Sequence, residues 1–171
     1  MSEERALSAL DELGLEYAVT RHGRVGSLAE AAAARGVEPR DLIKTLVVRR
    51  AADDYVLVLV PGDREISWPK LRAHLGVNRL SMPDADLALQ ATGYERGTIT
   101  PLGAAHVDSG ATWPVIADQT MSGRTVSVGA GAHGVAVTVD SDAMIAALGA
   151  QVADVTDPLE ASWGPERSSS C

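Results

Sequence analysis

The sequence contains very little cysteine and few aromatic side chains. Its one cysteine is Cys171, the last of 171 residues, so an internal disulfide is excluded and thiol catalysis is not expected. Phenylalanine is absent and aromatic residues make up 4% of the chain, so the core has to be built from valine, leucine, alanine and isoleucine. The length fits one domain with a substantial core.

Long apolar runs and basic leader segments are also missing. The longest uninterrupted apolar stretch covers only residues 55–61, far less than a membrane span, and the first five residues are too acidic for a secretory or transit peptide. We therefore expect a cytoplasmic protein without a membrane partner. The four histidines lack the spacing of metal ligands, so no metal is expected. They are His22, His74, His106 and His133.

Acidic residues outnumber basic ones, which gives a net charge of −8. This balance argues against extensive nonspecific binding to nucleic acid, and DNA is not an expected partner. Seven of the fifteen basic residues nevertheless fall within thirty positions, where they form either a solvated face or a local basic patch. Any nucleic-acid partner would be bound through a small footprint. The seven residues are Arg21, Arg24, Arg35, Arg40, Lys44, Arg49 and Arg50.

Hydrophobic periodicity and turn residues predict short helices interspersed with strands. Helices are expected over 2–13, 28–35, 67–75, 84–91 and 142–148, and strands over 17–20, 46–50, 55–60, 113–117, 125–128, 135–139 and 152–155. Because the strands come in antiparallel-style hairpins, we expect an α+β fold around a mixed sheet. Residues 1–157 would form a single domain and residues 158–171 a flexible C-terminal tail.

Lys44 is a charged residue within the apolar segment 42–48, at the start of a predicted strand. A buried ammonium needs a carboxylate, a phosphate or a polarised carbonyl as its partner. The alternative is a strand residue that points to solvent, and the sequence context does not decide between the two.

Two glycine-rich segments are candidates for backbone binding sites. Residues 93–103 contain three glycines and Pro101, so N–H groups there could converge on an anionic oxygen, with a structural turn as the alternative. Residues 129–134 contain His133, which could donate a hydrogen bond or shuttle a proton, or could simply belong to a hairpin connection. Neither segment has the Walker motif, and no nucleophile elbow is present. The glycines of residues 129–134 lie between two predicted strands and not before a helix, so no nucleotide cofactor is expected.

Together these features resemble the YbaK/ProX-type aminoacyl-tRNA editing domains over about residues 10–156. The similarity rests on a lysine at the mouth of a central strand, the loop Gly93-Tyr94-x-x-Gly97-x-x-x-Pro101-Leu102-Gly103, the turn 126–131 before strand 134–137, and the closing segment 148–155. The combination is more specific than any one part. The resemblance implies a mixed, largely antiparallel sheet with a barrel-like core and short surrounding helices.

The resemblance also implies hydrolysis of an ester that links a wrong amino acid to tRNA, with Cys- or Ala-tRNA(Pro) as the usual target. In the family, the lysine matching Lys44 positions the terminal nucleotide, and the glycine matching Gly97 offers a backbone donor to the scissile carbonyl. Water or a group of the substrate attacks, so orientation and charge stabilisation replace a metal or a triad. Substrate contacts are expected from Thr45, Tyr94, Thr98, Pro101, Gly131 and His133.

Two positions depart from the family pattern. Thr45 follows the lysine where relatives often have a polar amide, and His133 stands in a region where some alanine-directed members have a histidine. The choice between cysteine and alanine therefore stays open. Because the acidic charge predicts weak affinity for tRNA alone, prolyl-tRNA synthetase or an elongation factor is an expected helper. The alternative function is a non-catalytic module that binds a tRNA end or a small aminoacyl ligand.

Overall fold

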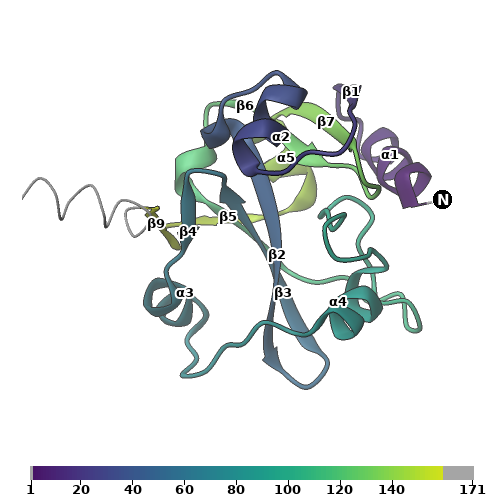
Figure 1. Cartoon of the computed structure of the whole chain (residues 1–171). Coiled ribbons are helices and arrows are strands. Elements are labelled where there is room, and N and C mark those ends of the chain that lie inside the picture. Colours follow the sequence, from purple (N-terminus) through teal and green to yellow (C-terminus); the bar gives the residue numbers. More distant parts are fainter. Residues whose placement is uncertain (1, 160–171) are drawn as a thin grey trace, which may run out of the picture.

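The computed structural model describes residues 2–159, which fold into short helices around one main sheet (Figure 1). The helices are α1 (Ser2–Glu12), α2 (Leu28–Arg35), α3 (Trp68–Leu75), α4 (Ala85–Thr92) and α5 (Ser141–Leu148), with 3₁₀ turns at Pro39–Asp41 and Gln119–Met121. The strands are β1 (Tyr17–Arg21), β2 (Leu42–Ala51), β3 (Asp54–Pro61), β4 (Arg64–Ile66), β5 (Val115–Asp118), β6 (Thr125–Gly129), β7 (Val135–Asp140), β8 (Gln151–Ala153) and β9 (Thr156–Pro158). None of the helices within residues 2–159 is long and apolar enough to cross a membrane.

The helices begin and end at residues that favour such boundaries. Ser27 accepts a hydrogen bond from the Glu30 N–H at 3.1 Å at the start of α2, which satisfies one of the free donors of the first turn. Gly36 ends the same helix with a φ of 73°, a left-handed conformation that glycine adopts without steric cost. The five predicted helices are confirmed, with boundaries that shift by one residue at most.

Seven strands form one mixed sheet in the order β1-β7-β6-β2-β3-β5-β8. The β2–β3, β6–β7 and β1–β7 pairs are antiparallel, whereas β2–β6, β3–β5 and β5–β8 are parallel. The parallel pairs are short, with two or three residues in register, so most of the pairing is antiparallel. The predicted fold class is therefore confirmed.

Strands β4 and β9 were not predicted from the sequence. They pair antiparallel as a separate two-stranded sheet, with Glu65 opposite Asp157. Each has only three residues, which is too short for a period-two pattern to be recognised. Strand β9 continues one residue past the predicted domain boundary at 157, and the predicted tail beyond Leu159 lies outside the described residues.

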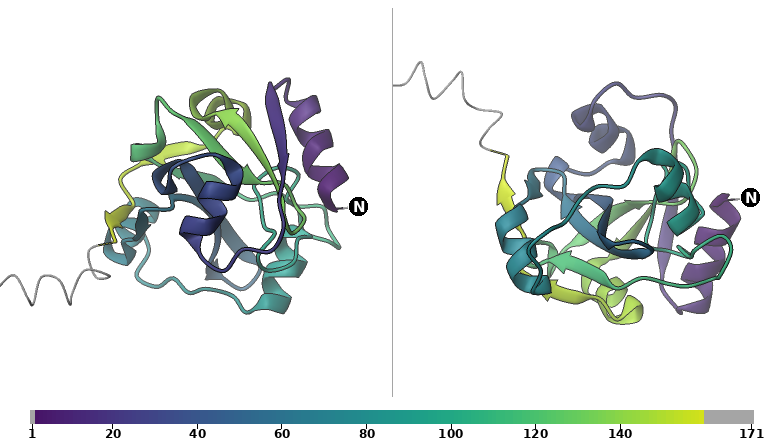
Figure 2. Two further views of the ribbon diagram at one scale, coloured as in Figure 1. Left: turned by 45° about the horizontal axis from the view of Figure 1, so that its top comes forward. Right: turned by 90° about the horizontal axis from the view of Figure 1, so that it is seen from below.

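Alternate residues of β3 enter two apolar clusters on opposite faces of the sheet. Leu57 and Leu59 belong to a larger cluster with residues of α1, α4 and α5, whereas Val56 and Val58 pack with Leu71 of α3. Figure 1 shows α3 and α4 on either side of the β2–β3 hairpin, and both views of Figure 2 keep α1 beside β1. Strand β3 is thus buried on both faces, as its continuous apolar run predicts.

Candidate functional site

A cavity of about 380 Å³ lies beside β2, where this strand separates from β6. The two strands pair only at Leu42 and Ile43. Farther along the same edge, the Arg49 N–H donates to the Ser81 carbonyl at 2.8 Å and the Ser81 N–H donates to the Arg49 carbonyl at 3.1 Å. The edge of β2 between these two contacts faces the cavity, whose volume falls within the range of small-molecule sites, about 300–1,000 Å³.

The exposed edge of β2 offers free hydrogen-bonding groups to this cavity. In a strand, every second residue directs its backbone N–H and C=O groups to the same edge. The N–H and C=O groups of Thr45 and Val47 therefore point to the edge at which Arg49 binds Ser81. Within residues 2–159 these groups form no hydrogen bond to another segment. The hydroxyl oxygen of Thr45 is also buried without a hydrogen-bond partner in that range.

Gly97 occupies a turn that glycine suits and also lines the cavity. The Thr98 N–H donates to the Glu95 carbonyl at 2.9 Å, and Gly97 is the third residue of this turn with a φ of 91°. A positive φ at this position is typical of a type II turn. In the described part of the chain the Gly97 N–H makes no hydrogen bond. The two interpretations from sequence, a structural turn and a backbone donor, are therefore compatible.

The two glycine-rich segments lie side by side. A β-carbon added to Gly97 would come within 3.3 Å of Cε1 of His133, and one added to Gly129 would come within 3.7 Å of the Ile99 carbonyl oxygen. Gly129 and Ile99 both line the cavity, whereas His133 is an exposed residue next to Gly97. The fold thus brings residues more than thirty positions apart to one rim.

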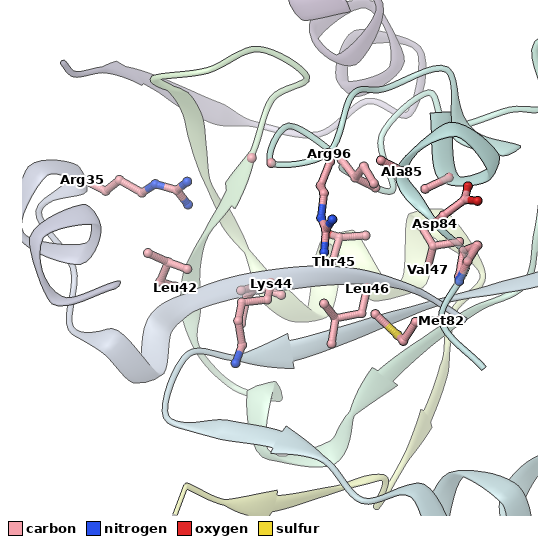
Figure 3. A pocket seen from close by; sticks show the side chains of 16 residues that line it. Arg35, Leu42, Lys44, Thr45, Leu46, Val47, Met82, Asp84, Ala85 and Arg96 are labelled. Carbon is pink, nitrogen blue, oxygen red and sulfur yellow. The ribbon is translucent and has the colours of Figure 1, made fainter. Parts of the chain in front are cut away.

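Lys44 and Thr45 leave β2 on opposite faces, as consecutive strand residues do. Figure 3 shows the Thr45 side chain extending toward Arg96, while the Lys44 ammonium points the other way. The Lys44 ammonium donates a hydrogen bond of 2.8 Å to the Arg64 carbonyl in β4. Lys44 lines the cavity through its half-buried stem, and its charged end reaches the boundary between β2 and β4.

The surroundings of Lys44 act on its charge in two directions. Burial lowers the pKa of the Lys44 ammonium, and the carboxylates of Glu65 and Asp63 offset part of this effect. Arg64, whose carbonyl accepts from Lys44, donates through Nε to the Thr156 hydroxyl at 2.6 Å. The small β4–β9 sheet therefore holds the partner of Lys44 in place.

Three charged residues of the cavity were not predicted from the sequence: Arg35, Asp84 and Arg96. Figure 3 shows the guanidinium groups of Arg35 and Arg96 reaching the cavity from different sides. Burial lowers the pKa of Arg35, and its Nε has no hydrogen-bond partner among the described residues. Asp84 caps α4 by accepting from the Leu87 N–H at 2.9 Å. The charged groups directed into the cavity are thus two guanidinium groups and one carboxylate, while the Lys44 ammonium is directed toward β4, and this balance favours an anionic ligand.

Besides His133, four residues expected to contact substrate do not line this cavity. Tyr94 is fully buried and its hydroxyl donates to the Leu102 carbonyl, and Gly131 packs so closely that an added β-carbon would lie 2.7 Å from the Tyr94 ring. Thr98 is also buried, and its hydroxyl donates to a backbone carbonyl at 2.8 Å. Pro101 lines a separate hollow. The hydroxyl groups of Tyr94 and Thr98 are thus used within the loop 93–103, where they hold its shape.

A family model described as an aminoacyl-tRNA editing domain matches residues 22–147. The chain belongs to this family. The editing domain is 35% identical over 97 residues to the proline–tRNA ligase of Thermosipho melanesiensis, a match that covers 57% of the chain and 17% of the ligase. It is 33% identical over 111 residues to the proline–tRNA ligase of Fervidobacterium nodosum, with 63% and 18% covered. The editing domain thus spans less than a fifth of these ligases.

A solved structure described as a "putative trans-editing enzyme for prolyl tRNA synthetase" is similar to the editing domain along nearly its whole length. The TM-score is 0.78 at 25% identity, and the match covers 91% of this chain and 97% of the other. The predicted family is confirmed by these findings together. Residues 2–159 of the editing domain contain no cluster of three or more His, Cys, Asp or Glu side chains that could hold a metal ion.

Proposed function

We propose that this editing domain is a hydrolase that deacylates mischarged aminoacyl-tRNA in trans, with Cys- or Ala-tRNA(Pro) as its substrate. The observation that carries the proposal is the cavity beside β2, where the free Gly97 N–H, the unpartnered Thr45 hydroxyl and the guanidinium groups of Arg35 and Arg96 surround one space. The relation to proline–tRNA ligases supports the class of tRNA. The description of the structural neighbour supports action on tRNA that is not bound to a ligase active site.

The proposed reaction needs no covalent intermediate with the protein. The ester carbonyl lies with its oxygen near the Gly97 N–H, and a water molecule attacks the carbonyl carbon. A carbon–oxygen bond to water forms, negative charge develops on the carbonyl oxygen, and the bond to the ribose oxygen then breaks. The ribose oxygen takes a proton that originates from the water, so the products are the free amino acid and uncharged tRNA. A donor at the developing oxyanion is worth about 10²–10³ in kcat.

The cations of the site bind and orient the tRNA end. An ammonium has three N–H donors, so Lys44 can hold the Arg64 carbonyl with one of them and the terminal nucleotide with the others. Arg96 and Arg35 are placed to bind phosphate oxygens, for which the planar guanidinium is suited. Apolar residues such as Val47, Ala88 and Ile99 leave a small space for the side chain of the amino acid.

A deacylation assay tests this function. Wild-type protein should hydrolyse Cys-, Ala- or Ser-tRNA(Pro) and spare correctly charged Pro-tRNA(Pro), which serves as the matched substrate control. Thr45→Val should slow the reaction, whereas Thr20→Val, the same change on the edge strand β1, should not. If wild type and Lys44→Ala are equally inert on all three mischarged tRNAs, the proposal fails. A tRNA-binding measurement on the same samples would then decide whether the chain is a binding module.

A further inference from the structure

We propose that a cluster of four arginines next to the cavity binds the phosphate backbone of the RNA whose 3′ end occupies the cavity. This cluster, here called the arginine surface, consists of Arg49, Arg50, Arg72 and Arg79. The inference rests on the proposed function, because it names the surface through which the proposed substrate would be held.

The arginine surface lines a second hollow of about 400 Å³. This hollow lies between the end of the β2–β3 hairpin, α3 and the segment that follows α3. No aspartate or glutamate is among its lining residues. Four guanidinium groups, of which only that of Arg50 is paired with a carboxylate within residues 2–159, form a local concentration of positive charge in a chain whose net charge is −8. The overall acidity therefore conceals one basic site.

Most of this positive charge is not paired with a carboxylate within residues 2–159. Arg50 is paired with Asp54, with Nη2 and Oδ1 2.9 Å apart. Arg49, Arg72 and Arg79 form no ion pair in the part of the chain that the structure describes. The Arg49 Nε donates to the Ala51 carbonyl at 3.3 Å, which leaves its two terminal nitrogens for a ligand. Guanidinium groups that are not paired with a carboxylate are suited to bidentate binding of phosphate oxygens.

Lys70 provides an internal contrast on the same helix, α3. Its ammonium lies 3.1 Å from Oδ1 of Asp154 and 3.0 Å from Oδ1 of Asp157, so its charge is already balanced. Arg72 lies two residues farther along α3 and faces the hollow instead. The chain thus pairs one cation of this helix with carboxylates and leaves the other available to a ligand.

The arginine surface continues directly from the cavity. Val47 lines the cavity and Arg49 lines the second hollow, and two residues along a strand span only about 7 Å. Likewise, Met82 lines the cavity and the preceding residue, Ser81, lines the second hollow. The backbone hydrogen bonds between Arg49 and Ser81 form the wall that the two hollows share. A nucleic-acid strand whose end enters the cavity can therefore pass over this wall onto the arginines.

Phosphate contacts suit a substrate that is chosen by its attached amino acid. Contacts to phosphate oxygens fix the position of a nucleic acid without reading its bases, so the choice of amino acid is left to the cavity. A short row of arginines is also the small footprint that an acidic protein can offer to RNA. An acidic protein partner could bind the arginines wherever they lay on the surface, so it would not account for their position next to the cavity.

Salt-dependent binding of uncharged tRNA(Pro) tests the arginine surface. Fluorescence anisotropy would compare wild type with Arg79→Glu, with Arg72→Gln/Arg79→Gln, and with Arg24→Glu as the matched control. Arg24 is an exposed residue of the segment between β1 and α2, and Figure 1 shows this segment at the top of the molecule, away from the turn of the β2–β3 hairpin. Each lost phosphate contact should lower the magnitude of the slope of log K against log salt concentration by about 1. Arg24→Glu should leave the slope and the affinity as in wild type.

Deacylation of two substrates separates this inference from the proposed function. On whole mischarged tRNA, Arg79→Glu should lower kcat/KM by about tenfold, whereas on the aminoacylated 3′-terminal trinucleotide, which is too short to reach the arginines, it should match wild type. If the variant loses activity on both substrates, or on neither, the inference is overturned. If wild type hydrolyses neither substrate, the proposed function fails, and the anisotropy slopes still judge the surface. The inference about the arginine surface would be overturned if both arginine variants had the wild-type slope of log K against log salt concentration, or if wild type did not bind tRNA.

Discussion

The two faces of β2 at the cavity differ in what they leave free. On one face, Lys44 is engaged by the Arg64 carbonyl and lies near two carboxylates. On the other face, the Thr45 hydroxyl has no partner among the described residues, and the side chain lies toward Arg96. The most conspicuous residue of the sequence is thus already anchored, whereas the unsatisfied groups belong to a neutral side chain and to the backbone. A charge in an apolar strand therefore does not by itself mark the reacting centre.

Gly97→Ala should have the largest effect, because it acts on the Thr45 face where the carbonyl would be polarised. The added β-carbon meets the His133 ring at 3.3 Å and strains a positive φ, so the N–H shifts away from the oxyanion. We expect kcat for deacylation to fall by about 10²–10³. Gly110→Ala is the matched control: its φ of 74° imposes a similar strain, but no atom lies within 4 Å of the new β-carbon. Full activity of Gly97→Ala would remove the backbone donor from the mechanism.

Lys44→Ala should follow, with kcat/KM lowered by about 10–100-fold, because a hydrogen bond from a charged donor is worth about 1.5–3 kcal/mol. Thr45→Val should cost about tenfold or less, since a neutral hydrogen bond contributes about 0.5–1.5 kcal/mol. The melting temperature of Lys44→Ala should fall by only about 2–4 °C, because water can reach the freed Arg64 carbonyl. A larger thermal loss with normal activity would assign Lys44 a structural role alone.

The pH dependence of deacylation distinguishes the Lys44 face of β2 from the Thr45 face. Because burial lowers the pKa of Lys44, its ammonium loses its proton at a pH below the ordinary value of 10.5. Activity that depends on the charged form should therefore decline as pH rises through this lowered pKa. Lys44→Arg keeps its charge over this range, so its decline should move to higher pH, while Thr45→Val should keep the wild-type profile. Rates must be corrected for spontaneous hydrolysis of the ester, and an unchanged profile in Lys44→Arg would contradict the assignment.

Glu65→Gln should have the smallest effect. Removing this carboxylate takes away attraction that favours the ammonium, so the pKa of Lys44 should fall further. A pH titration of the Lys44 side chain by NMR measures the shift directly. Glu16→Gln, an exposed change outside the surroundings of Lys44, provides the control and should leave that pKa where it is in wild type.

The sequence predicted the elements with strong local signals and missed what depends on distant parts of the chain. Ser27 and Gly36 are capping residues, so the bounds of α2 could be read directly. Arg35 is different, because nothing in its own helix indicates that it lines the same cavity as Arg96, some sixty residues away. Arg96 had a signal that was not used, namely its place as the one cation of the segment 93–103.

Some of the residues that the motifs predicted for the site line the cavity, and others do not. Lys44, Thr45 and Gly97 were predicted as neighbours and do line one cavity. Tyr94 and Gly131 were also expected to contact substrate, but they pack against each other beneath the rim. A motif contains both residues that face the ligand and residues that hold the loop, and the two kinds look alike in a sequence. Only the packing separates them.

The attachment of β2 at both ends has a consequence for how such a domain can diversify. Its edge is fixed by β6 at Leu42 and Ile43 and by Ser81 at Arg49, so the position of the strand does not depend on the segments that cover the cavity between these points. Exchanges of exposed lining side chains such as Met82 and Arg96 can therefore reshape the pocket without disturbing the register of the sheet. The sheet and the residues that line the cavity can thus change independently, so a new substrate specificity can arise while the fold is preserved.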